Sequence, residues 1–345
     1  MWLDKAPSMR GLYCMTNEFD KPFRTYEELL SILESRNVVI EDRTDAIKVL
    51  SDYSYYYLIN GFKSFFKTSD DDVFDEPVKF NDFITMFLIE NEFNSIILKY
   101  TLIIERSLKS KVSYRISDKY GVYTDYDSDD IRNNRSDYFF RGNYYSGPKR
   151  DNVLKRIKGK IKKNIKGKKT LSVSHYVENH NHLPLWIAIN CLPLGDVIVL
   201  YKILKQPDKT YVAENIIHSS ALDIEQKKEF LSQGLELLQG YRNKIAHGER
   251  VYSSNLHEKL PKKLVVAVTG SAISNSDYLK GFGKNDMFAV MIAITVLTRD
   301  LTRELFLNEI SYTLDVSEKL YISGKPVLDY LGLPKNLMEL LSNIK

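Results

Sequence analysis

The segment DIEQKKEFLSQGLELLQGYRNKIAHG, residues 223–248, decides the fold class. Asp223, followed three residues later by Gln226, has the pattern of a reciprocal N-terminal cap, so a helix is expected to start near residue 224. Gly248, directly after His247, predicts the C-terminal cap. At 100° per residue, one face of this helix collects the apolar or small residues Phe230, Gly234, Leu237, Leu238, Tyr241 and Ile245. The segment therefore predicts an amphipathic helix that packs one face into a core.

Three polar residues lie near the end of this predicted helix. Arg242 falls on the flank of the apolar face, while Asn243 and His247 fall opposite it. Asn243 and His247 are four residues apart, so their side chains are neighbours on the helix surface. Two interpretations follow: this is the ordinary exposed end of a surface helix, or it is a site that acts on a negatively charged substrate.

Helical periodicity also dominates the rest of the chain. Residues 80–118 form the longest periodic stretch, and a shorter one at 42–66 continues until Gly61 interrupts it. Residues 119–150 are rich in Gly, Asp, Asn and Ser and are expected to form a long loop. Only KLVVAVTG, residues 263–270, suggests a strand, and one strand cannot make a sheet. The predicted fold class is all-α. Further helical patterns cover residues 24–37, 183–205 and 285–310.

Composition and terminal sequence favour a cytoplasmic protein. The 345 residues carry a formal net charge of +4, and the two cysteines, Cys14 and Cys191, lie too far apart for a metal-ligand motif. The N-terminus has no apolar segment of a secretory signal. The longest apolar run, Met287–Leu297, is too short to cross a bilayer, so no membrane association is expected.

Residues 149–169 form a strongly basic segment in which Asp151 is the single acid. Leu154, Ile157, Ile161 and Ile165 recur at spacings of three and four, which predicts a helix with one packed stripe. Such a charge density attracts polyphosphate chains, so RNA binding is one interpretation, and a solvated face is the other. The candidate RNA contacts are Lys149, Arg150, Lys155, Arg156, Lys158, Lys160, Lys162, Lys163, Lys166, Lys168 and Lys169.

Common catalytic motifs are missing from the sequence. GFGKND, residues 281–286, lacks the hydroxyl residue and the first glycine of a phosphate-binding loop, and neither HExxH nor GxSxG occurs. His175, His180 and His182 lie in a polar stretch without a nearby cysteine. We therefore expect no bound metal and no cofactor.

Several segments together resemble one known family. YRNKIAHGERVY, residues 241–252, resembles the HEPN ribonuclease motif of the Abi-like abortive-infection proteins of bacteria, the AbiD and AbiF group. Residues 21–50, the tyrosine-rich block 55–66 and the helical pattern at 183–204 resemble blocks of the same family in the same order. The resemblance spans roughly residues 20–250. The basic segment 149–169 is longer than the family leads one to expect.

The resemblance implies a HEPN-type helical bundle with an N-terminal helical extension and a basic insertion. The expected regions are 1–118, 119–182 and 183–345, packed as one compact unit, with the RNxxxH motif in the last. The implied activity is metal-independent RNA cleavage in antiphage defence by a homodimer. Arg242 would stabilise phosphate charge, His247 would act as general acid or base, and Asn243 would orient either one. Supporting residues would be Tyr241, Glu105 and Arg106. The alternative is a non-catalytic module that binds a small structured RNA.

Overall fold

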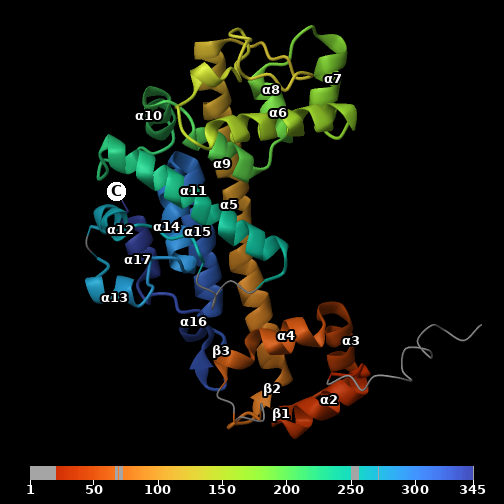
Figure 1. Ribbon diagram of the computed structural model, residues 1–345. Coiled ribbons are helices and arrows are strands. Elements are labelled where there is room, and N and C mark those ends of the chain that lie inside the picture. Colours follow the sequence, from red (N-terminus) through yellow and green to blue (C-terminus); the bar gives the residue numbers. More distant parts are fainter. Residues whose placement is uncertain (1–20, 67–68, 70–72, 250–255, 271, 345) are drawn as a thin grey trace, which may run out of the picture. The chain divides into compact units, whose positions relative to one another are not determined.

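A computed structural model describes residues 21–66, 69, 73–249, 256–270 and 272–344 (Figure 1). Its internal contacts divide the chain into two units, residues 1–88 with 322–324 and residues 89–321 with 325–345. Helix α5 (Phe80–Tyr120) begins in the first unit and continues into the second. The all-α class is confirmed, because helices dominate both units.

The first unit consists of short helices and one small parallel strand pair. In this pair Val38 is in register with Val78, and Val39 with Lys79. The helical pattern was expected to continue as far as Gly61, but it breaks earlier, at Ser54, which has a positive φ of 55°. The second helix, in turn, runs through Gly61 to Phe62. The Ser54 side chain accepts a hydrogen bond from Tyr57 N and so caps the second helix. The elements are α2 (Tyr26–Ser35), β1 (Val38–Val39), α3 (Arg43–Tyr53), α4 (Tyr55–Phe62), η1 (Lys63–Phe65) and β2 (Val78–Lys79).

The second unit contains the remaining helices and carries the candidate motif. Residues 121–149 are irregular apart from the 3-10 turn η2 (Arg141–Asn143), which confirms the predicted loop. From there to the motif the elements are α6 (Arg150–Lys166), α7 (Leu171–Asn179), α8 (Leu185–Ala188), η3 (Ile189–Cys191), α9 (Leu194–Lys202), α10 (Gln206–Glu214) and α11 (Ile224–Ala246). After it come α12 (Lys262–Thr269), α13 (Asn275–Leu279), α14 (Met287–Leu297), α15 (Asp300–Ser317), β3 (Tyr321–Ile322), β4 (Lys325–Pro326), α16 (Val327–Tyr330) and α17 (Leu337–Ser342).

Helix α14 lies at the centre of this unit. Every residue of α14 is buried, as expected for a helix that is apolar on all sides. It packs against α11, α15 and α17. Gly234 of α11 faces α14, where a Cβ would make ordinary van der Waals contact with Leu297 and Ala293. The longest apolar run of the sequence is therefore a core helix.

The strand expected at residues 263–270 is wrong, because these residues form helix α12. Leu264, Val265 and Val268 are buried at helical spacing. Pro261 precedes the helix, and Gly270, with a φ of 62°, ends it in the left-handed conformation. The segment is therefore helical although its valines favour a strand, because residues at both ends favour a helix.

Candidate functional site

The candidate motif lies at the C-terminal end of α11, and both predicted caps of this helix are confirmed. Asp223 accepts a hydrogen bond from Gln226 N at 2.8 Å, and the Gln226 side chain accepts one from Asp223 N at 2.9 Å. At the other end, Gly248 adopts a φ of 68°. Gly248 N donates to Ile245 O and Glu249 N to Lys244 O, which is the hydrogen-bond pattern of a Schellman motif. The position of His247 is thus set by an ordered helix terminus.

Tyr241 fixes this end of α11 to the protein core. Its hydroxyl donates a 3.0 Å hydrogen bond to Oδ1 of Asn94 on α5, and both side chains are buried. Figure 1 shows α11 crossing α5. Burial raises the pKa of Tyr241 well above its usual value, and the nearby carboxylates of Glu90 and Asp286 raise it further. Tyr241 therefore stays neutral and acts as a buried hydrogen-bond donor that holds α11 in place.

The three polar residues of the motif face away from that anchor, as predicted. Arg242 and Asn243 are half-buried, and His247 is exposed. Arg242 Nη1 donates to Asn243 Oδ1 at 3.3 Å. Within the described parts of the chain, Arg242 has no carboxylate partner. Asn243 therefore positions the guanidinium of Arg242, which stays available to an anionic ligand.

The expected supporting role of Glu105 and Arg106 needs correction. Glu105 forms an ion pair with Lys109 on its own helix, at 2.8 Å. Arg106 lines a cavity between α5 and α8. Neither forms a hydrogen bond or ion pair with α11 in the region that the structure covers. The contact of α5 with the motif helix is made instead by Asn94, about three turns earlier on α5.

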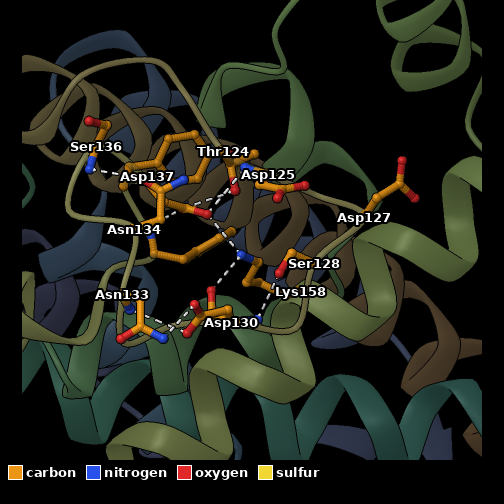
Figure 2. A network of polar contacts seen from close by, with 12 residues as sticks. Thr124, Asp125, Asp127, Ser128, Asp130, Asn133, Asn134, Ser136, Asp137 and Lys158 are labelled. Carbon is orange, nitrogen blue, oxygen red and sulfur yellow. Dashed lines mark hydrogen bonds and ion pairs between the residues drawn. The ribbon is translucent and has the colours of Figure 1, made fainter.

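The basic segment forms helix α6, and its predicted apolar stripe is confirmed by the burial of Leu154, Ile157 and Ile161. Lys158, a candidate RNA contact, is only 1% exposed. Its ammonium group forms a 2.8 Å ion pair with Asp137, whose side chain is equally buried (Figure 2). Asp137 also accepts hydrogen bonds from Thr124 Oγ1 and from the backbone of Asp125. Lys158 therefore joins α6 to the preceding loop and cannot contact RNA.

Several other basic side chains of α6 also have protein partners. Arg150 is buried and pairs with Asp151 at 2.8 Å, which removes it from the candidate RNA contacts. Arg156 and Lys160 both pair with Asp196, a buried residue of α9. In addition, Lys162 donates to a backbone carbonyl, and Lys168 pairs with Glu178. In the described structure, the exposed candidates without an ion pair are Lys149, Lys155, Lys163, Lys166 and Lys169.

The three histidines near α7 gather around an aromatic ring. The rings of His180 and His182 lie 4.2 and 5.6 Å from that of Tyr176, between centroids. His175 contacts Asn179 one helical turn later. Among the described residues, no three His, Cys, Asp or Glu side chains are grouped so that they could hold a metal ion.

No helix in the described part of the chain is both long and apolar enough to cross a membrane.

Sequence reasoning missed Asn94, although its position carried a signal. Asn94 lies within the periodic stretch 80–118, seven residues after Phe87 on the same helical face. A polar residue on an otherwise apolar face predicts a buried hydrogen bond. Its partner could not be named, because Tyr241 is 147 residues away in the chain.

Comparison with known proteins places the chain in one family. No curated protein matches it, and no solved structure matches it. The family described as Abi-like protein matches residues 48–253, which is more than half of the chain. The match extends from helix α3 through the whole of α11 and so includes Arg242, Asn243 and His247. The protein belongs to the Abi-like family.

Proposed function

We propose that the protein is a metal-independent endoribonuclease that acts as an effector of abortive infection. Membership of the Abi-like family supports the defence role. The resemblance of RNKIAH, residues 242–247, to the HEPN motif supports the activity. One observation carries the proposal. Arg242 and His247 lie at the same end of a firmly anchored helix, and Arg242 has no carboxylate partner in the described structure.

The chemistry of RNA cleavage suits these residue types. The reaction activates a 2′-hydroxyl, stabilises negative charge on the phosphorane and protonates the 5′-oxygen that leaves. A histidine side chain titrates near neutral pH and can act as general base or general acid. His247, at the C-terminal end of α11, is the candidate proton donor to the leaving oxygen. Arg242 stays charged and can donate two hydrogen bonds to phosphate oxygens, while Asn243 orients it.

The test is cleavage of labelled RNA by purified protein in excess EDTA. We expect cleavage by the wild type, and its loss in Arg242→Ala and in His247→Ala. Both side chains are at least partly exposed, so the thermal unfolding midpoints should stay close to that of the wild type. Lys227→Ala, which removes a charge near the start of the same helix, is the matched control and should remain active. Cleavage that requires a metal, or that survives both substitutions, would contradict the proposal.

A second candidate function is a non-catalytic module that binds a small structured RNA. The observation in its favour is the set of exposed lysines on and beside α6 that have no ion pair in the described structure. In that case Arg242 and His247 would only hold phosphate. Binding of varied RNAs without any cleavage, together with weaker binding when these lysines are changed to glutamine, would favour the module. The lysines are Lys149, Lys155, Lys163, Lys166 and Lys169.

A further inference from the structure

A cavity of about 320 Å³ lies in the second unit between α5 and the segment formed by α8 and η3. Its volume is at the lower end of the range for small-molecule sites, roughly 300–1,000 Å³. The proposed ribonuclease motif uses none of its residues. The lining consists of Arg106, Lys109, Ser110, Ser113, Tyr114, Trp186, Ile189 and Asn190.

Two exposed aromatic rings line this cavity. Trp186 is 45% exposed, and its ring contacts no other aromatic ring in the described structure. Tyr114 is 59% exposed and stacks on Tyr211 with a centroid distance of 6.2 Å. The guanidinium of Arg115 lies 5.0 Å from the centroid of the Tyr211 ring. This stack covers one face of the Tyr114 ring, and no other ring of the described residues lies against it. Exposed aromatic surfaces beside a cavity suit stacking on a planar ligand.

The charges at the cavity favour one anionic group. Lys109 is balanced by Glu105, and both side chains are largely buried. Arg106 is exposed and has no ion pair within the residues that the structure describes. Asn190 donates one hydrogen bond to the carbonyl of Trp186 at 3.2 Å, which leaves its side-chain oxygen free to accept from a ligand. These groups match the parts of a single nucleotide. The guanidinium suits the phosphate, the aromatic rings suit the face of the base, and the polar groups suit its edge.

We infer that this cavity binds one unpaired nucleotide of an RNA strand. Its base stacks on Trp186 or Tyr114, and its phosphate binds Arg106. A duplex is a poorer fit, because its bases are stacked inside the helix and cannot enter a cavity. The inference rests on the proposed function for its choice of RNA, and it adds a site that recognises the substrate outside the cleavage motif.

Packing connects the cavity with the other candidate RNA surfaces. Helix α6 contacts η3, which contributes Ile189 and Asn190 to the lining. Helix α9 begins just after η3 and packs against α11, where its Gly195 lies against the side-chain amide of Gln239. Gln239 precedes Asn243 by one helical turn. The cavity and the motif helix α11 are thus linked through η3 and α9, which pack against α6 and α11.

The test measures binding apart from cleavage. In the cleavage-deficient His247→Ala background, fluorescence anisotropy would follow a labelled eight-nucleotide single-stranded RNA. Stacking contributes about 1–3 kcal/mol per base, so Trp186→Ala should weaken binding roughly 5- to 150-fold. Trp186→Phe should retain most of the affinity, and Arg106→Gln should weaken it. Tyr312→Ala is the matched control, because Tyr312 is 72% exposed on α15 and does not line the cavity. Thermal unfolding midpoints would confirm that each variant is folded.

The outcomes separate this inference from the proposed function. Binding that depends on Trp186, in a protein that never cleaves RNA, would support the cavity while contradicting the ribonuclease. Cleavage that depends on His247, with binding unchanged in Trp186→Ala and Arg106→Gln, would overturn the cavity alone. An RNA duplex should bind equally well with and without Trp186. A mononucleotide that binds through Trp186 as tightly as the strand would assign the cavity to a free nucleotide and overturn the assignment to RNA.

Discussion

At the scale of single residues, two effects act in opposite directions on the carboxyl group of Asp286: helix capping favours its charged form, and burial disfavours it. Asp286 caps α14 by accepting hydrogen bonds from Ala289 N at 2.8 Å and from Gly283 N at 3.1 Å. Burial nevertheless penalises its negative charge and raises the pKa of the Asp286 carboxyl to about 6. Because the raised value belongs to the folded state, folding favours the protonated carboxyl.

The pH dependence of stability follows from the direction of this shift. Below about pH 4 Asp286 is protonated in both the folded and the unfolded state, and its stabilising contribution is complete. As the pH rises through about 6, the folded protein must hold a half-buried anion, and roughly 3 kcal/mol of that contribution is lost. Asp286→Asn keeps a side chain that can cap a helix and cannot ionise. Urea denaturation should therefore show the variant gaining stability over the wild type between pH 4.5 and pH 7.5. A difference that stays constant with pH would contradict this assignment.

Residue positions in the candidate site were predictable only where they depend on a single helix. The 100° spacing sufficed to place Arg242, Asn243 and His247 away from the core face. The same reasoning could not show whether Glu105 and Arg106 contact α11, because this depends on which part of α5 meets α11. That crossing point is fixed by tertiary packing, and the sequence contains no local signal for it.

At the scale of elements, long periodic segments were predictable and short apolar ones were not. Helices α5 and α11 each contain several turns, so their periodicity exceeds what chance would produce. The eight residues of α12 contain only two turns and are rich in valine, and composition alone indicated a strand. The basic helix α6 was predicted as a helix, but burial of Lys158 against Asp137 depends on a loop that has no periodicity.

The buried ion pair of α6 should be important for stability. Lys158→Met leaves the Asp137 carboxylate buried without its partner, which should cost about 3–5 kcal/mol in the free energy of unfolding. Lys163→Met, at an exposed position of the same helix, should change it by less than about 0.5 kcal/mol. Urea denaturation of both variants gives the comparison. An equal loss of unfolding free energy in both variants would show that Lys158 has no special role. Recovery of that free energy in the double variant Lys158→Met with Asp137→Asn would confirm that the broken ion pair is the cause.

At the scale of the whole molecule, the sparse motif favours a symmetric homodimer. One chain supplies a single motif histidine, while RNA cleavage needs both a base and an acid. Two chains that pair the motif face would place two His247 and two Arg242 around one groove. The tyrosine-rich segment 53–62 is our candidate interface, and Tyr56 in it is 77% exposed. Aromatic residues of this kind are enriched in interface cores.

Light scattering should therefore report twice the chain mass of 40.1 kDa. Mixing wild-type protein with His247→Ala protein should produce heterodimers of reduced activity, because each contains one motif histidine instead of two. Mixing with Lys227→Ala protein provides the control and should leave the activity unchanged. A monomer that still cleaves RNA would disprove the dimer, and so would heterodimers with full activity.

The ion pairs of α6 also determine how strongly RNA binding should respond to salt. Each phosphate that a protein cation neutralises releases counterions, and the logarithm of the affinity falls by about 0.7–0.9 per contact for each tenfold rise in salt. All eleven basic residues of 149–169 together would give a slope of about −8 to −10. Because carboxylates already neutralise several of them, the five unpaired lysines support a slope of about −4. The basic segment would then bind RNA moderately and exchange it readily at physiological ionic strength.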